Sequence, residues 1–450
     1  TAGHCTVYGR DGLRVTSVVC AVALLSACMG DSAVSRSPVS MLGMSGPDGE
    51  AVSQAPASAL DAEMENGGQS EIIQNLLNRR SVLDNGPFAQ VANAVLAANS
   101  RAAEADLRAA KLRAEARANN WLPSIGPNVS LTSLGAVVST MVVEQVLFDN
   151  GRKKAERDYA AADVEVAAVT LAQDTNKRVL AGLELYISAQ EASARANVNA
   201  AAMERMEHYA YVMSERVKGG VSSRVDAQIV TQKLNQMQAD MASDQETAAG
   251  ALSELSAMTA TPITGVSGIS TLNDGNVDRT PLTVMKAQAE STRMIAEATA
   301  ARAGFLPSLT AGGTLGNGGG IGLSVGSDNG LSLGTGAALG AIEEQKAAAA
   351  ARVGQVQEDA NRALRALEGE LASLQRQETQ AQPLATQASA NFDIYSEQQK
   401  AGQRAVPDVV GIFETKVRAE REAVGIKYEI ARVMLKIAAL NGTLVNGEQI

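Results

Sequence analysis

Apolar positions along the chain follow two periods, and the change between them separates long helical tracts from short strand islands. Within Arg152–Lys218, the apolar seam of Val179, Leu183 and Tyr186 has the 4,3 spacing of one helix face. The tract contains no proline and a single internal glycine, Gly182. At 1.5 Å per residue it would extend for roughly 100 Å. Almost no ordinary globular domain needs such an element.

The first strand island follows Leu122-Pro123, where the proline ends the preceding helix. From Val129 onward apolar and polar residues alternate, and a β-branched run extends over Val137–Val146. The residues Asp149-Asn150-Gly151 then offer a turn and a helix N-cap. The pattern predicts a pair of strands at 124–148.

A second, glycine-rich island lies between residues 308 and 340. Ile321, Leu323 and Val325 alternate with glycine and serine. The residues Ser327-Asp328-Asn329-Gly330 are a hairpin signal, and alternation resumes over Leu331–Leu339. This pattern predicts a second strand pair with one apolar face. A phosphate-binding loop is disfavoured, because no G-x-G-x-x-G motif opens a helix here.

The two islands belong to an internal repeat. Trp121-Leu-Pro-Ser matches Phe305-Leu-Pro-Ser at an offset of 184 residues, and Gly220 matches Gly402 at an offset of 182. Each copy contains a strand pair, a long helix, a tight turn and a returning helix. The second copy stops near Leu440, and an expected helix over Pro87–Asn120 supplies its missing part, which interlocks the two halves.

These patterns divide the chain into five parts. They are residues 1–28, a lipoprotein-type signal peptide; 29–69, a flexible low-complexity tether; 70–260, the first repeat, with the strand pair 124–148 and a helical hairpin at 152–258; 261–442, the second repeat, with a helix at 281–304, a strand pair at 308–340 and a helical hairpin at 343–440 interrupted at Pro383; and 443–450, a C-terminal tail.

The N-terminal segment has the features of an export signal. Arg10 and Arg14 precede the apolar run Val15–Leu25, which is too short to span a bilayer. The ending Leu25-Ser26-Ala27-Cys28 resembles the lipobox of bacterial lipoproteins, in which the cysteine is lipidated. No aspartate follows Cys28 to signal retention in the inner membrane, so the resemblance implies the outer membrane. The alternative is an ordinary cleaved signal peptide with an incidental cysteine.

Composition disfavours several classes of function. The net charge of -10 is mild and spread along the chain, which argues against a nucleic-acid partner. Aromatic residues make up only 3% of a chain rich in alanine, as expected for helices packed through small side chains. The two histidines are His4, in the leader, and His208, which is expected to be a solvated helix residue. We therefore predict no enzyme activity, catalytic residue, cofactor or metal site.

Four strands with apolar alternation in an exported protein indicate a membrane-embedded part. Backbone groups in lipid must all be hydrogen-bonded, so four strands cannot span a membrane alone. Three copies closing one barrel would supply twelve strands, an even number. The expected fold is mainly α with a small β part. It has long antiparallel helical hairpins and four strands per protomer, which trimerise into a 12-stranded β-barrel on an α-helical periplasmic tunnel.

Several short segments, repeated in order along the chain, carry a family resemblance. They are the doubled Leu-Pro-Ser after a helix, Gln145–Arg152, Gly220–Asp226, Gly402–Asp408 and Ala439–Leu444. With them, the chain from about Ser70 to Thr443 resembles the TolC-like outer-membrane factors, which are trimeric exit ducts of drug efflux pumps and type I secretion systems. The resemblance implies a homotrimer in the outer membrane of a Gram-negative bacterium, extending into the periplasm. The implied partners are a periplasmic adaptor protein, an inner-membrane RND or ABC translocase, and outer-membrane lipid.

The same resemblance implies a gate at the periplasmic tip. A family aspartate in the first helix–helix turn pairs with an arginine of the neighbouring subunit, and the matching positions are Asp226 and Arg404. Asp408 matches one of two constriction carboxylates, Gly411 stands in place of the other, and Gln399 replaces a tip tyrosine. The alternative is that Asp226 only caps a helix and that Arg404 is solvated.

The two helix–helix turns also resemble the family's docking surface for the adaptor. The residues that match it are Gly220, Val221, Ser222, Gly402 and Gln403. Trp121, the only tryptophan, lies where strands should meet helices, as an interfacial anchor or through simple packing beside Pro123.

A second class of protein would also have such a leader and such long helices. It is a lipid-anchored helical stalk or adhesin without a pore. A stalk has no use for paired strand islands or for a broken returning helix. For an exit duct, the sequence leaves open whether drugs or an unfolded protein pass through it.

Overall fold

The structure is a computed structural model that describes residues 70–83, 86–98, 102–131, 137–261, 263, 265–270, 272, 279–315, 320–330 and 332–450. All of these residues lie in one compact unit, Pro56–Ile450. The expected signal peptide, the tether and Cys28 fall outside the described residues.

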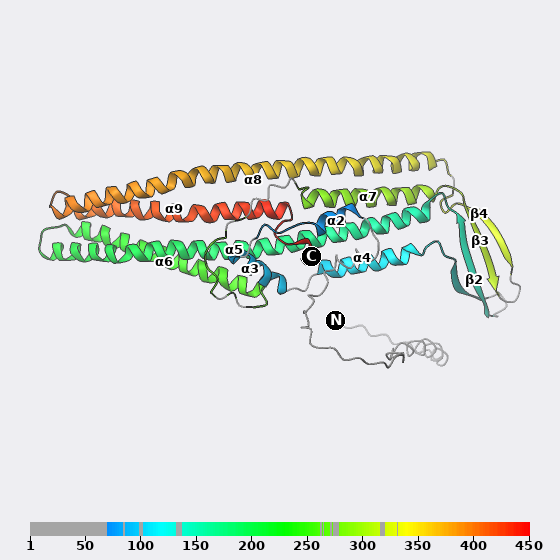
Figure 1. Ribbon diagram of the computed structural model, residues 1–450, viewed down its shortest axis with the longest axis horizontal. Helices are drawn as coiled ribbons and strands as arrows, with labels where there is room; N and C mark the ends of the chain where they lie inside the picture. Colours follow the sequence, from blue (N-terminus) through cyan, green and yellow to red (C-terminus); the bar gives the residue numbers. More distant parts are fainter. Residues whose placement is uncertain are drawn as a thin grey trace, which may run out of the picture. The chain divides into compact units, whose positions relative to one another are not determined.

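Long helices form most of this unit and are arranged as two antiparallel hairpins. The first consists of α5 (Arg152–Lys218) and α6 (Arg224–Met258), and the second of α8 (Thr335–Lys400) and α9 (Val406–Leu440). A further helix, α7 (Leu282–Ala303), packs against α5 and α8 on the side of the sheet. Figure 1 shows the two helix–helix turns at one end and the strands at the other.

Three shorter helices precede the first strand. They are α2 (Glu71–Leu77), α3 (Pro87–Ala97) and α4 (Ala102–Ala118). The single helix expected over Pro87–Asn120 is therefore wrong, since the structure has two helices there. The sequence between them contains Asn99 and Ser100, residue types that favour helix ends over helix interiors. A short 3₁₀ helix, η1 (Gly447–Gln449), ends the chain.

The single glycine of α5 has a packing function. A Cβ atom on Gly182 would lie 2.7 Å from Cγ2 of Val95, which is closer than two carbon atoms can approach. Gly182 is buried and therefore lets α3 lie directly on α5. The buried Val179, Leu183 and Tyr186 confirm the apolar seam predicted for this helix.

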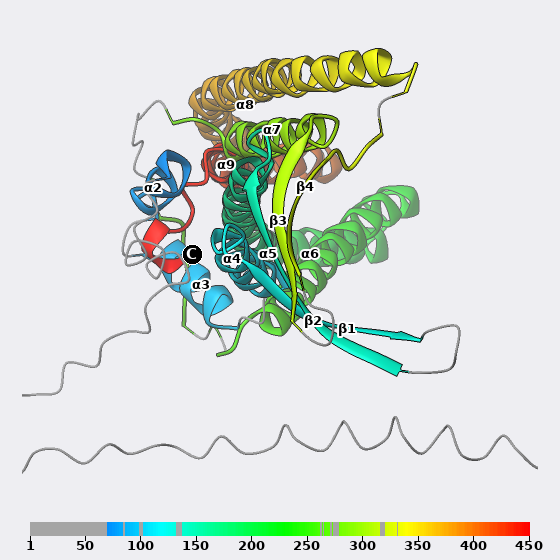
Figure 2. The same cartoon turned by 90° about the vertical axis from the view of Figure 1, so that its right-hand side faces the viewer.

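Four strands form one antiparallel sheet in the order β1-β2-β3-β4. They are β1 (Ser124–Leu131), β2 (Val137–Phe148), β3 (Ser308–Leu315) and β4 (Ile321–Gly326). Because β2 pairs with β3, the sheet joins the two sequence repeats. Figure 2 shows the four strands lying in front of the helices when viewed from this end.

The second strand pair differs from the one expected at 308–340. The structure pairs β3 with β4, and residues 335–339, expected as a strand, form the first turns of α8. Residues 327–330 do not connect two strands: the Asn329 amide donates to the carbonyl oxygen of Gly304 at the end of α7. An alternation of leucine with glycine and alanine does not distinguish a strand from a helix, because alanine favours helix. The helix then continues through Pro383.

Two apolar clusters hold the helices together. One contains residues of α2, α3, the central part of α5, the start of α7 and the end of α9. The other lies nearer the helix–helix turns and joins α5, α6, α8 and α9 through residues that include Met206, Phe392 and Phe413. Each cluster joins segments from both repeats, so the two hairpins are packed against one another within one protomer.

Arg79 fixes the end of the second repeat to the start of the first. Its buried guanidinium donates to the carbonyl oxygens of Asn441, after α9, and of Thr280, before α7. Burial, together with the nearby charge of Arg279, lowers the pKa of Arg79 to about 10. The contacts match the expected interlocking of the two halves in space.

Candidate functional site

One face of the sheet is apolar and exposed to solvent. Residues paired across antiparallel strands point to the same face. The rows Pro127–Met141–Leu315, Ile125–Val143–Gly313–Ile321 and Phe148–Leu309–Val325 therefore share one face. Ile125 is 64% exposed, Leu315 65% and Ile321 95%. A soluble monomer rarely exposes an apolar surface continuous across four strands.

The opposite face of the sheet carries mostly polar or small side chains, together with Val142 and Val146 of β2. The row Ser124–Glu144–Gly312–Gly322 lies there, and so does the row Val146–Thr310–Ser324. The hydroxyl groups of Thr310 and Ser324 are hydrogen-bonded to each other across two strands. The sheet thus has a mainly apolar face, which includes Gln145, and a more polar face, which includes Val142 and Val146.

The sheet is open at both edges. Among the described residues β1 pairs only with β2, and β4 only with β3, so each has an unpaired backbone edge. Pro127 lies in β1, as expected for an edge strand, because proline lacks the amide that a central strand needs. Such edges are available for pairing with strands of another chain.

A turn with two left-handed residues connects β2 to α5. Asn150 and Gly151 have φ values of 53° and 83°. The Asp149 carboxylate accepts hydrogen bonds from the amides of Gly151 (3.1 Å) and Lys153 (2.6 Å), and so caps the helix. The Asn150 side-chain amide donates to the carbonyl oxygen of Pro307 at 2.8 Å, which joins this turn to the segment that leads into β3.

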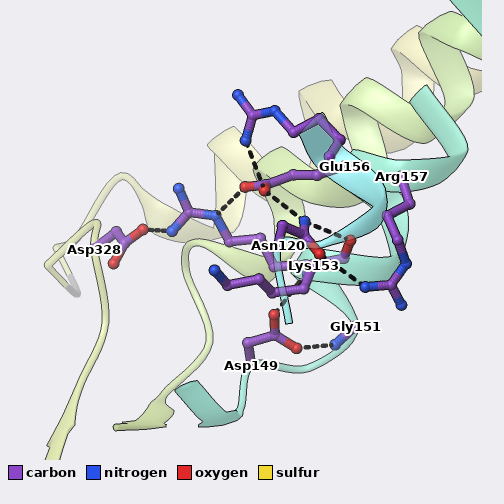
Figure 3. A network of polar contacts seen from close by, with 9 residues as sticks. Asn120, Asp149, Gly151, Lys153, Glu156, Arg157 and Asp328 are labelled. Carbon is purple, nitrogen blue, oxygen red and sulfur yellow. Dashed lines mark hydrogen bonds and ion pairs between the residues drawn. The ribbon is translucent and has the colours of Figure 1, made fainter. Parts of the chain in front are cut away.

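Glu156 is the centre of a polar network where the sheet meets the helices (Figure 3). It accepts from Arg117 on α4 at 3.0 Å and pairs with Arg152 at 3.3 Å. Arg152 also pairs with Asp328, in the segment after β4. The side-chain amide of Asn120 donates to Glu156 and its oxygen accepts from Arg157. Side chains from α4, from the residue Asn120 that follows it and from α5 thus meet around one carboxylate, and Arg152 links them to the segment after β4.

Trp121 lies at this junction between α4 and β1. Its side chain is 60% exposed, and its carbonyl oxygen accepts a hydrogen bond from the Gln145 side chain at 2.7 Å. The role of Trp121 as an interfacial anchor stays a prediction.

The two helix–helix turns have the same backbone geometry. In the first, Gly220 has a φ of 71° and the Val221 amide donates to the carbonyl oxygen of Arg216. In the second, Gly402 has a φ of 76° and the Gln403 amide donates to the carbonyl oxygen of Gln398. Both are Schellman turns, in which glycine adopts the left-handed conformation after the helix.

The residues expected at the gate lie on these turns but are not brought together within one protomer. Asp226 is in the first turn of α6, where the N-cap is Ser223, whose hydroxyl accepts from the Val225 amide at 3.1 Å. Asp408 is exposed in the first turn of α9. The carbonyl oxygen of Gln399 accepts from the Gly402 amide.

Arg404 has two partners in its own protomer that the sequence did not indicate. Its guanidinium carbon lies 4.7 Å from the centre of the Tyr395 ring, and its Nε donates to the Gln398 side chain at 3.0 Å. In the first turn, Nε of Arg216 donates to the Ser222 hydroxyl at 3.1 Å. The two pairs occupy equivalent positions at the repeat offset of 182 residues, but the donor and acceptor positions are exchanged between them.

The described residues give no other candidate for chemistry. His208 is exposed on α5 beside Arg205, Lys416 and Phe413. Among the described residues no group of histidine, cysteine, aspartate and glutamate side chains could hold a metal ion. In the same part of the chain, no helix combines the length and the apolar character needed to cross a membrane.

Comparisons with known proteins identify the fold. No family model and no curated protein matches the sequence. Among solved structures, the outer-membrane channel OprN matches with a TM-score of 0.70 and 16% identity, over 90% of this chain and 100% of that one. The outer membrane protein VceC of Vibrio cholerae matches with a TM-score of 0.64 and 15% identity, over 86% and 100%. The open MtrE outer membrane channel of Neisseria gonorrhoeae matches with a TM-score of 0.66 and 16% identity, over 82% and 94%. The chain therefore has the TolC-like channel fold.

Proposed function

We propose that this chain is the protomer of a homotrimeric outer-membrane exit duct. The observation that carries the proposal is a four-stranded sheet with one exposed and mainly apolar face, one more polar face and two open edges. A sheet in lipid must close on itself, because unpaired backbone groups are costly there. Three copies would pair β4 of one protomer with β1 of the next into a 12-stranded barrel, with the mainly apolar face toward lipid and the more polar face toward the lumen.

The helical hairpins would continue this barrel as a tunnel through the periplasm. Both hairpins run away from the sheet and end in exposed turns. We place the adaptor contact at Gly220, Val221, Ser222, Gly402 and Gln403, and the translocase, of RND or ABC type, beyond it. The division into residues 1–28, 29–69, 70–260, 261–442 and 443–450 belongs to the same proposal, as does lipidation at Cys28. Such a duct has no catalytic residues, so the inner-membrane partner supplies the energy.

The tip would be closed between subunits by Asp226 and Arg404, with Asp408 forming a ring of three carboxylates at the constriction. Gln399 lies beside this gate. A single exposed ion pair contributes only about 0–1 kcal/mol, so three equivalent links would have to act together to hold the tip closed.

The test is single-channel recording of the purified full-length protein in a planar bilayer, with its oligomeric mass measured in the same detergent. A trimer with a small conductance that rises clearly in the Asp226→Ala, Arg404→Ala double variant supports a duct closed at these turns. An equal conductance in both proteins keeps the duct and removes the latch. A well-folded trimer without any channel activity would instead favour the lipid-anchored stalk.

A further inference from the structure

The Arg404 side chain is held in one place by its own protomer. The ring of Tyr395 lies under one face of the guanidinium, and the Gln398 side chain accepts from Nε. Both residues belong to the last two turns of α8, whose end is fixed by the hydrogen bond from the Gln403 amide to the Gln398 carbonyl oxygen. Arg404, which is exposed at the turn, therefore rests against the helix that precedes it.

These contacts use the face and Nε of the guanidinium and leave its outer edge open. Among the described residues, the two Nη groups of Arg404 have no hydrogen-bond partner. Paired Nη or Nη–Nε donors match the geometry of a carboxylate. A free arginine loses much side-chain freedom when it binds, whereas one already held by a ring and an amide has lost most of it beforehand.

We propose that Tyr395 and Gln398 are positioning residues that hold Arg404 ready to bind a carboxylate of a neighbouring copy of this chain. The proposal rests on the proposed trimer, in which Asp226 is the carboxylate. The family resemblance suggested that Gln399 stands in place of a tyrosine at the tip. The proposal assigns the aromatic group of the tip to Tyr395, which lies one helical turn before Gln399. Tyr395 acts through Arg404 and does not itself cross the subunit boundary.

The experiment compares the fraction of time that the wild-type trimer and the Tyr395→Leu trimer stay open in planar bilayers. Loss of this cation–π contact, between the exposed Arg404 and the half-buried Tyr395, should weaken each link about two- to fivefold. Because three independent links would contribute together, the open fraction should rise at least about tenfold. Tyr395→Phe keeps the aromatic face and should stay closed like the wild type. Gln398→Ala, which preserves the backbone hydrogen bond, should also open the channel.

Two controls separate positioning from a general effect on folding. Tyr211→Leu removes a 65%-exposed tyrosine near the first turn and should leave the open fraction unchanged. In an Arg404→Ala background, Tyr395→Leu should have no further effect. The inference is wrong if Tyr395→Leu raises the open fraction equally in the Arg404→Ala background and in the wild type. It is also wrong if Tyr395→Leu alone leaves the open fraction unchanged or lowers it. Either result leaves the proposed duct intact. Absence of any channel in the wild type would overturn the proposed function itself.

Discussion

The helices α5 and α8 hold equivalent places in the two repeats, yet their surroundings differ greatly. Their lengths are nearly equal, 67 and 66 residues, but 26 residues of α5 are buried against seven of α8. α5 is covered by α2, α3, α4, α6, α7 and α9, whereas α8 packs against α7 and α9. The long helix of the first repeat is therefore the centre of the protomer, and that of the second lies at its surface.

This difference indicates where further copies would fit. The free side of α8 carries exposed apolar side chains, including Leu384 and Ile394. The sheet presents a similar imbalance, with open edges at β1 and β4. A helix with so few buried residues is stabilised poorly by its own protomer. In the proposed trimer, the exposed side of α8 would face the first hairpin of the next protomer.

The largest expected effect comes from one of the few anchors of α8. Phe392 is fully buried, with its ring centre 5.0 Å from that of Phe413 and the Arg205 guanidinium 5.2 Å above it. Phe392→Ala should lower the free energy of unfolding by about 3–5 kcal/mol, because it leaves a cavity. Chemical denaturation of the solubilised protein measures this loss. Gln380→Ala, at an exposed polar position of the same helix, should change it by less than about 0.5 kcal/mol.

Glycine substitutions should have opposite signs in the two helices. Gly182→Ala places a Cβ against Val95 and should destabilise by about 1–3 kcal/mol. Gly369→Ala in α8 meets nothing within 4 Å, and should stabilise by about 0.5–1 kcal/mol, because alanine is the better helix former. Thermal unfolding of both variants checks the signs. In a Val95→Ala background, Gly182→Ala should cost much less than it does in the wild type; a clash with some other group is indicated if it does not.

Sequence reasoning succeeded where one period dominated over many residues. The long helices, the two glycine turns and the strand pair after Pro123 all have such local signals. It failed where the outcome depended on distant partners. Nothing local shows that Gly182 is needed by Val95, and the alternation at Leu331–Leu339 fitted a strand until the actual partner of β3 was known.

The candidate site shows the same limit. The turn residues could be located because Gly220 and Gly402 carry positive φ values that glycine favours. The contacts of Arg404 could not be located in this way. Tyr395 precedes Arg404 by nine residues, and the two side chains meet only because the chain turns back after the end of α8. Glu156 was also missed, since its three partner side chains come from α4, α5 and the segment between them.

The difference between α5 and α8 in the cost of a substitution should be smaller for ion pairs than for core packing. Asp163 on α5 accepts from Arg113 on α4 at 2.9 Å and from Arg293 on α7 at 2.8 Å, and its hydrogen bond raises the pKa of Arg293. Asp163→Asn should cost about 1–2 kcal/mol, because it loosens two helices at once. Asp359 on α8 pairs only with Arg362, one turn away, and Asp359→Asn should cost no more than about 0.5 kcal/mol. Equal losses in urea denaturation would contradict the distinction.

The last comparison concerns Tyr186, a buried tyrosine of α5 that is covered by the loop before α7. The Tyr186 hydroxyl donates to the carbonyl oxygen of Gly268 at 3.0 Å, and its ring meets Phe88 edge-on at 6.2 Å. Tyr186→Phe keeps the ring contact but leaves that carbonyl without its donor, which should cost about 1 kcal/mol near neutral pH.

The pH dependence of this loss distinguishes the buried tyrosine from an exposed one. Burial, with a smaller contribution from Tyr428, raises the pKa of Tyr186 to about 12, whereas an unfolded tyrosine ionises near pH 10. A raised pKa means that the folded state favours the protonated phenol, so its contribution is complete below pH 10 and is lost as the pH rises through 12. Stability measured from pH 9 to 12 should therefore fall less steeply in Tyr186→Phe than in the wild type, although Tyr428, whose pKa is also raised, keeps part of the slope. Tyr211→Phe, at an exposed position of the same helix, should fall as the wild type does. Identical slopes in all three proteins would mean that Tyr186 reaches solvent, and that the loop before α7 does not close over α5.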